Sequence, residues 1–165
     1  MVYTGWLKRS TPQNIVIGGA SGAMPPLVAA AAITGSIPLS ALYLFGIIFF
    51  WTPPHFWALA LYLKEDYAEA RIPMLPVVKG DKVTCWNILL YSIILAVINT
   101  LFLITGEVGM IYLGPALILS GMFLFYAIRL LRNPTPDMGF QVFKFSLVYL
   151  AILFLVVIVD SVLPF

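Results

Sequence analysis

Five apolar stretches of more than twenty residues follow one another along the chain, at 14–34, 38–63, 83–105, 110–130 and 140–163. A helix of roughly twenty apolar residues crosses the hydrocarbon core of a bilayer, which is ~30 Å thick. Stretches of this length therefore predict an all-α membrane protein with about five transmembrane helices. We expect them to form a single transmembrane domain over residues 1–165.

The composition agrees with this expectation and excludes several other classes. Charged residues make up 10% of the chain, against about 25% in soluble domains. The net charge of +2 is too small to indicate a nucleic-acid partner, and the single cysteine, Cys85, excludes an internal disulfide. Lys8 and Arg9 follow a short apolar segment instead of preceding one, so no signal peptide is expected at the start of the sequence.

Basic residues gather on one side of the expected membrane domain. If the spans alternate in direction, the connections at 8–13, 64–82 and 131–138 share a side, and those at 35–37 and 105–109 share the other. All nine Lys and Arg residues lie on the first side or, for Lys144, close enough to reach it. The positive-inside rule assigns that side to the cytoplasm of a bacterial plasma membrane, or to the matrix of a mitochondrion with the protein in its inner membrane.

The connection at 64–82 is the leading candidate for chemistry. Asp66 and, one helical turn later, Glu69 could hold Mg²⁺, which keeps most of its waters and bridges to the phosphate oxygens of a substrate. Neighbouring lysine and arginine side chains could bind the same phosphate group and stabilise its charge as it leaves. The alternative is a solvated loop whose lysines only set the topology. The rigid apolar segment PMLP at 73–76 favours the first interpretation, because it would hold the loop at the membrane surface.

His55 is the one histidine of the chain and lies within an expected span, beside the Pro-Pro pair at 53–54. An ionisable residue inside a membrane span is a functional hypothesis by default. Its spacing from Tyr62 and Asp66 places all three on one face of a continuous helix. The alternative is a neutral histidine hydrogen-bonded to a carbonyl that a proline leaves free, and both interpretations stay open.

Small and polar residues on the other spans predict helix packing. Gly18 and Gly22 have the spacing that lets two helices approach closely in lipid. The Pro-Pro pair at 25–26 predicts a bend in the same span. Asn87 and Asn99 are expected to form hydrogen bonds between helices.

Two strings, YTGWLKR at 3–9 and WTPPHFWALALYLKEDYAEARIPMLPVVKG at 51–80, carry a resemblance to a known family. They resemble the UbiA superfamily of intramembrane prenyltransferases, and the second string resembles its haem-modifying branch. The resemblance covers essentially the whole chain. It implies the C-terminal part of a nine-helix bundle around a central cavity, without the first Asp-rich motif and about four helices.

The resemblance also implies a reaction and a set of site residues. Farnesyl would pass from farnesyl diphosphate to the 2-vinyl group of haem b, with Mg²⁺ on the diphosphate, to give haem O for terminal oxidases. Asp66 would be catalytic and would hold the metal together with Glu69, and His55 would contact the haem. The diphosphate would be bound by Tyr3, Lys8, Arg9 and Lys79.

Further expectations follow from the same resemblance. The second Asp-rich motif of the superfamily is usually DxxxD, but Ala70 stands at its second acidic position here, as is common in the haem branch. The expected partners besides the lipid bilayer are haem A synthase or a factor of terminal-oxidase assembly. Because half of the metal site and of the cavity wall would be missing, this chain is expected not to turn over by itself.

Two other interpretations stay open. The first is a quinone-type or chlorophyll-type prenyltransferase of the same superfamily, against which the WTPPHFW string and Ala70 speak. The second is a non-enzymatic membrane subunit that binds acidic lipid or a partner through its basic face. Binding of a farnesyl diphosphate analogue that depends on Mg²⁺ and on Asp66 would separate the enzymes from the subunit.

Overall fold

The computed structural model describes residue 11 and residues 13–163 of the chain. Its elements, in chain order, are α2 (Asn14–Ala23), α3 (Pro25–Thr34), α4 (Leu39–Tyr62), α5 (Lys64–Glu69), α6 (Leu75–Lys79), α7 (Asp81–Leu101), the 3₁₀ helix η2 (Phe102–Thr105), α8 (Met110–Arg132) and α9 (Pro136–Val162). Five helical segments of the described chain are long and apolar enough to span a membrane: Asn14–Thr34, Leu39–Tyr62, Asp81–Thr105, Met110–Arg132 and Pro136–Val162. The expected all-α membrane fold with five spans is confirmed.

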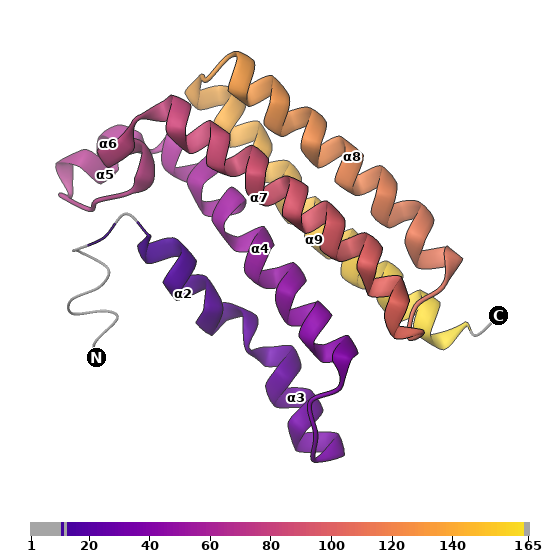
Figure 1. Cartoon of the computed structure of the whole chain (residues 1–165). Coiled ribbons are helices and arrows are strands. Elements are labelled where there is room, and N and C mark those ends of the chain that lie inside the picture. The colour runs from indigo at the N-terminus through magenta and orange to yellow at the C-terminus, as the bar shows by residue number, and fades with distance from the viewer. Residues whose placement is uncertain (1–10, 12, 164–165) are drawn as a thin grey trace.

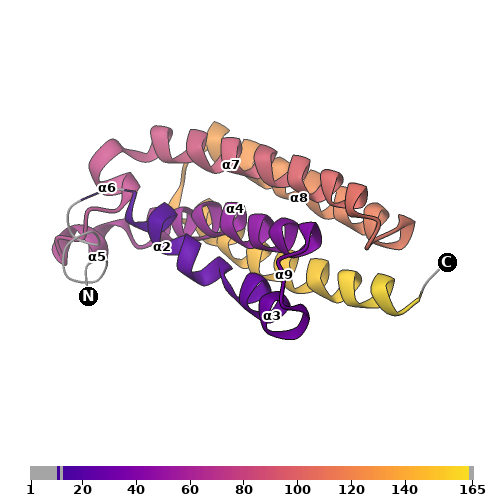
Figure 2. The same cartoon turned by 60° about the horizontal axis from the view of Figure 1, so that its bottom comes forward.

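Four of the long helices form a closed ring. Helix α4 packs against α7 and α9, and α8 packs against the same two helices (Figure 1). This is the arrangement of an antiparallel four-helix bundle, in which the connection from α4 to α7 is the long one and contains α5 and α6. Helices α2 and α3 pack against α4 outside the ring, and the turned view in Figure 2 shows α3 and α7 on different sides of α4.

The two Pro-Pro pairs have different effects. At Pro25 the first span divides into α2 and α3 after Met24, which confirms the expected bend. Proline has no N–H and its ring crowds the preceding turn of a helix. A helix can therefore begin at a proline, but a proline in the interior of a helix strains it. Pro53 and Pro54 nevertheless lie inside the uninterrupted helix α4, as membrane helices allow when neighbouring groups satisfy the freed carbonyls.

Two glycines, Gly19 and Gly139, lie at close contacts between helices. A β-carbon at Gly19 of α2 would lie 3.0 Å from the methyl carbon of Thr52 in α4. A β-carbon at Gly139 of α9 would lie 2.9 Å from the carbonyl oxygen of Ala58 in α4. A β-carbon at Gly22 would meet no atom within 4 Å. Gly22 of the expected pair therefore makes no such contact, and α2 approaches α4 closely at Gly19.

A buried polar cluster joins three helices of the ring. Asn99 of α7 accepts a hydrogen bond from the Tyr112 hydroxyl of α8 at 3.1 Å. Its amide nitrogen donates to the Tyr149 hydroxyl of α9 and, at 3.4 Å, to the Ser120 hydroxyl of α8. The expected interhelical role of Asn99 is confirmed. Asn87 instead donates to a carbonyl of its own helix at 2.8 Å, so it forms no such link.

Asp160, near the end of α9, caps the start of α8. Its carboxylate accepts hydrogen bonds from the backbone N–H of Gly109 and, at 3.0 Å, of Tyr112. The first N–H groups of a helix have no partner within the helix, and a negative charge near them is favourable. A side chain from a neighbouring helix therefore stabilises the turn between α7 and α8.

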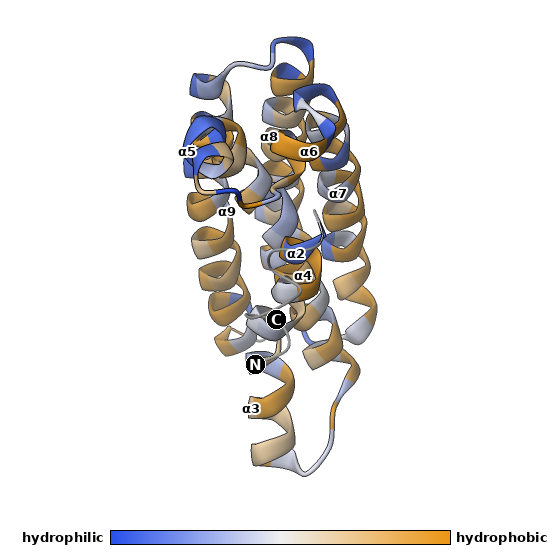
Figure 3. Cartoon of the chain, turned by 90° about the vertical axis from the view of Figure 1, so that its left-hand side faces the viewer, coloured by the Kyte–Doolittle hydropathy of each residue, from blue (hydrophilic) through white to orange (hydrophobic). Residues whose placement is uncertain are grey.

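The two ends of the bundle differ in polarity. Figure 3 shows hydrophilic segments at the end that carries α5, α6 and the connection between α8 and α9, while the long helices are hydrophobic along their middle. The connections at 64–82 and 133–136 meet at this end, as the alternating spans predicted. We call it the charged end of the bundle.

Candidate functional site

A polar groove of about 410 Å³ opens at the charged end, between the start of α5 and the connection that precedes α9. The chain positions its walls by short turns: α4 ends at Tyr62, Leu63 leaves the helical conformation, and α5 begins at Lys64. The residues that line it are Leu61, Tyr62, Lys64, Glu65, Asp66, Asp81, Pro134, Thr135 and Pro136. We call it the carboxylate groove.

Asp66 lies where the sequence interpretation needs it, at the edge of a groove. Its side chain is exposed in the first turn of α5, next to Glu65, which lines the same groove. Glu69 is exposed at the last residue of α5, one turn after Asp66, and is not among the described residues that line the groove. The groove therefore gathers negative charge at a helix start that faces water.

An ion pair fixes one wall of the carboxylate groove. Lys64 Nζ lies 2.7 Å from Asp81 Oδ1, and both side chains are 40% exposed. Asp81 is the first residue of α7, so the pair joins α5 to α7. A half-exposed pair of this kind contributes at most about 1 kcal/mol of stability. Its larger effect is to hold a cation beside Glu65 and Asp66.

The carboxylates at this groove fit Mg²⁺ that is shared with a substrate. Within the part of the chain that the structure describes, no three His, Cys, Asp or Glu side chains come together to hold a metal by themselves. Mg²⁺ differs from structural metals in this respect, because it is commonly bound through one or two carboxylates together with waters and substrate phosphates. Asp66 lies on the groove and could contribute one such carboxylate, whereas Glu69, one turn later, is not among the described residues that line it.

The segment after α5 is anchored to the bundle. Arg71 adopts a left-handed backbone conformation with φ of 54° and turns the chain back. Met74, Leu75 and Pro76 of the PMLP segment are buried, and α6 packs against α4 and α7, so this part of the loop is held to the bundle. Lys79 is exposed at the end of α6 and is not among the described residues that line the carboxylate groove.

Three expected site residues lie outside the described part of the chain. Tyr3, Lys8 and Arg9 belong to the segment before residue 11, so their predicted contact with a diphosphate stays a prediction. The described residue nearest to them in sequence that reaches a groove is Asn14, at the start of α2.

His55 lies away from the carboxylate groove, in the interface between α4 and α9. Its side chain is 6% exposed, and Nδ1 lies 2.7 Å from the hydroxyl oxygen of Ser146. The turn at Leu63 interrupts the helical face that His55, Tyr62 and Asp66 were expected to share, and Tyr62 and Asp66 are exposed. The partner of His55 is a hydroxyl of α9 instead of a freed carbonyl of α4.

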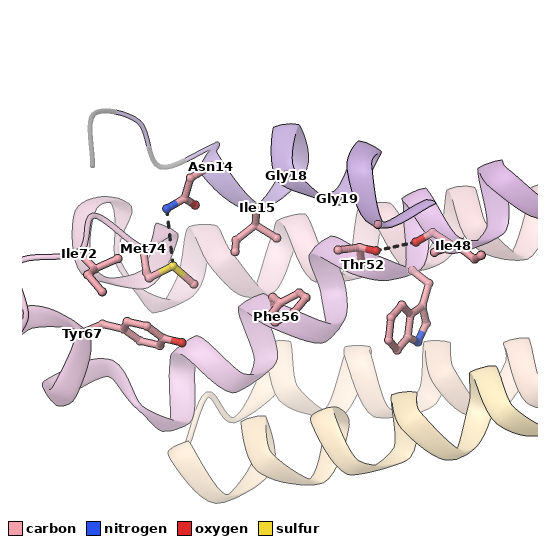
Figure 4. Close-up of a pocket in the computed structure, with 12 residues that line it drawn as sticks. Asn14, Ile15, Gly18, Gly19, Ile48, Thr52, Phe56, Tyr67, Ile72 and Met74 are labelled. Atoms are coloured by element: carbon pink, nitrogen blue, oxygen red, sulfur yellow. Dashed lines mark hydrogen bonds between the residues drawn. The ribbon is translucent and has the colours of Figure 1, made fainter. Parts of the chain in front are cut away.

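A second groove, of about 510 Å³, lies between α2, α4 and the segment that follows α5. Figure 4 shows it with Tyr67, Ile72 and Met74 at one end and Ile48 and Thr52 at the other. Its lining is mostly apolar, and Asn14, which donates to the sulfur of Met74 at 3.9 Å, adds a polar group at the end near α5. We call it the apolar groove.

Glycines keep the apolar groove open. Gly18, Gly19 and Gly22 of α2 line it, so the small residues of the first span leave space beside α4. Sequence reasoning assigned Gly18 and Gly22 to helix packing and did not identify a groove. Three glycines within five residues can indicate either close helix packing or a groove. Only the position of the neighbouring helix decides between these two.

Comparisons with known proteins give one family. The model of the UbiA prenyltransferase family matches residues 1–157. The chain is 55% identical over 160 residues to a curated protoheme IX farnesyltransferase of Nitrosomonas europaea, and 52% identical over 160 residues to that of Methylococcus capsulatus. Each match covers 97% of this chain and 54% of the relative. The chain thus spans about half the length of the curated relatives it matches.

A solved structure has the same fold. It comes from a study of digeranylgeranylglyceryl phosphate synthase in membranes, and it matches with a TM-score of 0.87 at 20% sequence identity. The match covers 97% of this chain and 56% of that one. At this identity the likeness concerns the arrangement of helices alone.

Proposed function

Because the chain belongs to the UbiA prenyltransferase family, we propose that it forms part of an intramembrane protohaem IX farnesyltransferase. The reaction transfers farnesyl from farnesyl diphosphate to the 2-vinyl group of haem b and gives haem O. The identity of 50–55% to curated relatives of that name supports the choice of haem over other acceptors. Since the chain spans about half of those relatives, the activity belongs to the longer assembly.

The observation that carries the proposal is the carboxylate groove at the charged end. Asp66 lies on it, together with Glu65 and the Lys64–Asp81 ion pair, beside an apolar groove that enters the membrane domain. Tyr67, the residue after Asp66, lines the apolar groove. Adjacent residues of α5 thus reach a polar and an apolar groove, which suits a substrate with a charged head and a hydrocarbon tail.

The residues of the charged end bind and orient the diphosphate. Asp66 and Glu69 would hold Mg²⁺, which would supply positive charge beside the diphosphate leaving group. Exposed Lys79, and Tyr3, Lys8 and Arg9 from the start of the chain, bind the remaining phosphate oxygens.

The apolar groove takes the hydrocarbon of a substrate. Its volume of about 510 Å³ lies within the range of ~300–1,000 Å³ that is usual for small-molecule sites. Phe56 and Trp51 of α4 contribute aromatic rings to its wall. Rings of this kind attract a cation such as the allylic farnesyl cation.

The charged end faces the cytoplasm of a bacterial plasma membrane. The relatives reported above are bacterial, and basic connections are retained on the cytoplasmic side. Haem A synthase, or a factor of terminal-oxidase assembly, is the expected partner, because haem O is too apolar to leave the membrane freely.

Binding of a non-hydrolysable farnesyl diphosphate analogue to the chain in detergent tests the proposal. We expect binding to require Mg²⁺ and to weaken at least tenfold in Asp66→Ala. Glu107→Ala serves as the matched control, because Glu107 lies in the connection at the opposite end of the bundle. Equal binding by Asp66→Ala and wild type, or binding without Mg²⁺, would refute the proposal and favour a non-enzymatic subunit.

A further inference from the structure

Asp66 and Tyr67 are consecutive residues of α5, and their side chains reach different grooves. Asp66 lines the carboxylate groove, and Tyr67 lines the apolar groove. Figure 4 shows the ring of Tyr67 at the end of the apolar groove near α5, with its hydroxyl directed into the groove. A molecule whose polar head occupies the first groove and whose tail occupies the second must therefore pass this hydroxyl.

The backbone of Tyr67 is held on both sides. Its N–H donates to the carbonyl oxygen of Leu63, just after α4, at 3.1 Å, and its carbonyl oxygen accepts from the N–H of Ile72 at 3.0 Å. The second bond closes the turn at Arg71, which has the left-handed conformation. The side chain itself is half-buried. The fold therefore determines the point from which the ring extends into the groove.

Tyr67 is the one polar side chain of the apolar groove that has no hydrogen bond among the described residues. Thr52 donates to a carbonyl of its own helix at 2.7 Å, and the indole N–H of Trp51 donates to a carbonyl of α9 at 2.8 Å. Asn14 donates to the sulfur of Met74. The proton of the Tyr67 hydroxyl is therefore the one that this groove offers to a ligand.

The position of this hydroxyl indicates which atom of a ligand it meets. A phenol hydroxyl donates one hydrogen bond, and a hydrocarbon has no acceptor for it. In a prenyl diphosphate, the acceptor at the border of the hydrocarbon is the ester oxygen, which joins the first carbon to the diphosphate. The other oxygens of the diphosphate lie farther from the hydrocarbon, on the side of the carboxylate groove.

We propose that the hydroxyl of Tyr67 is a catalytic group, which donates a hydrogen bond to the ester oxygen of the prenyl diphosphate. The proposal rests on the proposed function, since it takes a prenyl diphosphate as the ligand. It goes further because it assigns a residue to the bond that breaks, whereas Asp66 and the cations act on the rest of the diphosphate.

The contact assists the loss of the diphosphate without transfer of a proton. When the bond between the first carbon and the ester oxygen breaks, both electrons stay on the oxygen, which leaves with the diphosphate. The hydrocarbon keeps the positive charge as an allylic cation. The negative charge on the oxygen strengthens the hydrogen bond from Tyr67, and a donor already directed at developing charge lowers the barrier.

A ligand that differs in one atom tests the contact. In farnesyl thiolodiphosphate, a sulfur atom replaces the ester oxygen of farnesyl diphosphate, and such a sulfur accepts hydrogen bonds weakly. Calorimetry of the full chain in detergent, with Mg²⁺ and without haem, measures the affinity for each ligand. We expect the wild type to bind the oxygen ligand about tenfold more tightly, the effect of one hydrogen bond to a charged group. Equal affinities in the wild type would overturn the proposal.

Tyr67→Phe shows whether the preference for oxygen comes from this hydroxyl. The ring remains, so farnesyl diphosphate should bind about tenfold more weakly, while the thiolodiphosphate and inorganic diphosphate bind as before. Tyr43→Phe is the matched control and should keep the preference, because Tyr43 stacks on Phe102 and lines neither groove. If Tyr67→Phe weakened both farnesyl ligands equally, or neither of them, the hydroxyl would not contact the ester oxygen.

Asp66→Ala distinguishes this proposal from the proposed function. It should weaken the oxygen and sulfur ligands alike, because Asp66 acts on the diphosphate that both of them carry. Binding that requires Mg²⁺ and Asp66 but shows no preference for the ester oxygen would refute the role of Tyr67 and leave the proposed function standing. Binding that requires neither Mg²⁺ nor Asp66 would refute both.

Discussion

Gly139 in α9 lies so close to α4 that a β-carbon there would come within 2.9 Å of the carbonyl oxygen of Ala58. The same β-carbon would lie 3.2 Å from Cβ of Leu61. These atoms belong to the backbone or to the base of a side chain, so they cannot turn aside. The close approach of α9 to α4 therefore requires a glycine at position 139. The same approach forms a wall of the carboxylate groove and brings Ser146 to His55.

Gly139→Ala is expected to destabilise the protein by roughly 1–3 kcal/mol, the usual effect of an added methyl group in a tightly packed interior. Thermal unfolding in detergent measures the loss. Gly121→Ala is the control, because a β-carbon there meets no atom within 4 Å and alanine favours a helix over glycine by ~1 kcal/mol. Equal destabilisation by both substitutions would contradict the close contact.

Asp160→Ala should loosen the start of α8. The substitution removes the acceptor of the Gly109 and Tyr112 N–H groups, and loss of a helix cap costs about 1 kcal/mol. Hydrogen exchange of the Tyr112 amide should become faster in the variant. Glu107→Ala removes a carboxylate from the same connection and should leave that exchange rate unchanged. Unchanged exchange in Asp160→Ala would show that the cap does not hold the turn.

Asn99→Ala should destabilise the ring of four helices. It leaves the hydroxyls of Tyr112 and Tyr149 without their partner, and interhelical hydrogen bonds in membranes contribute ~0.6 kcal/mol each on average. We expect a loss of about 1–2 kcal/mol, measured by thermal unfolding in detergent. Asn87→Ala is the matched control in the same helix, since its amide bonds within α7. A comparable loss in the control would refute the specific role of Asn99.

Gly22→Leu should fill part of the apolar groove without straining the helix, because a β-carbon at Gly22 has open space around it. If the groove takes the hydrocarbon, the variant binds the farnesyl diphosphate analogue at least tenfold more weakly but still binds inorganic diphosphate. Calorimetry with the two ligands in the presence of Mg²⁺ measures both. Gly121→Leu controls for added bulk on a helix. If Gly22→Leu weakened the binding of both ligands to the same extent, the hydrocarbon would not lie in the apolar groove.

The helices could be predicted from the sequence because hydropathy acts locally. Each expected span agrees with a helix of the structure to within a few residues, and the bend at Pro25 was also predicted. Pro53 and Pro54 show the limit of such rules. A local rule predicts a break at a proline, yet α4 continues through both of them.

The candidate site could be predicted only in part. Asp66 was identified from its position between an apolar span and a charged connection. Its neighbours on the groove, Asp81 and the residues at 134–136, come from segments that meet only after the ring has closed. The partners of His55 and Asp160 lie 91 and 51 residues away in sequence, so no local pattern indicates them.

The packing of α2 and α3 has a consequence for the apolar groove. These helices pack chiefly on α4, whereas α4, α7, α8 and α9 close on one another. Within the described chain, the first span is therefore held to the ring mainly through one helix, α4. A small shift of α2 relative to α4 would change the width of the apolar groove between them without disturbing the contacts among the other four spans.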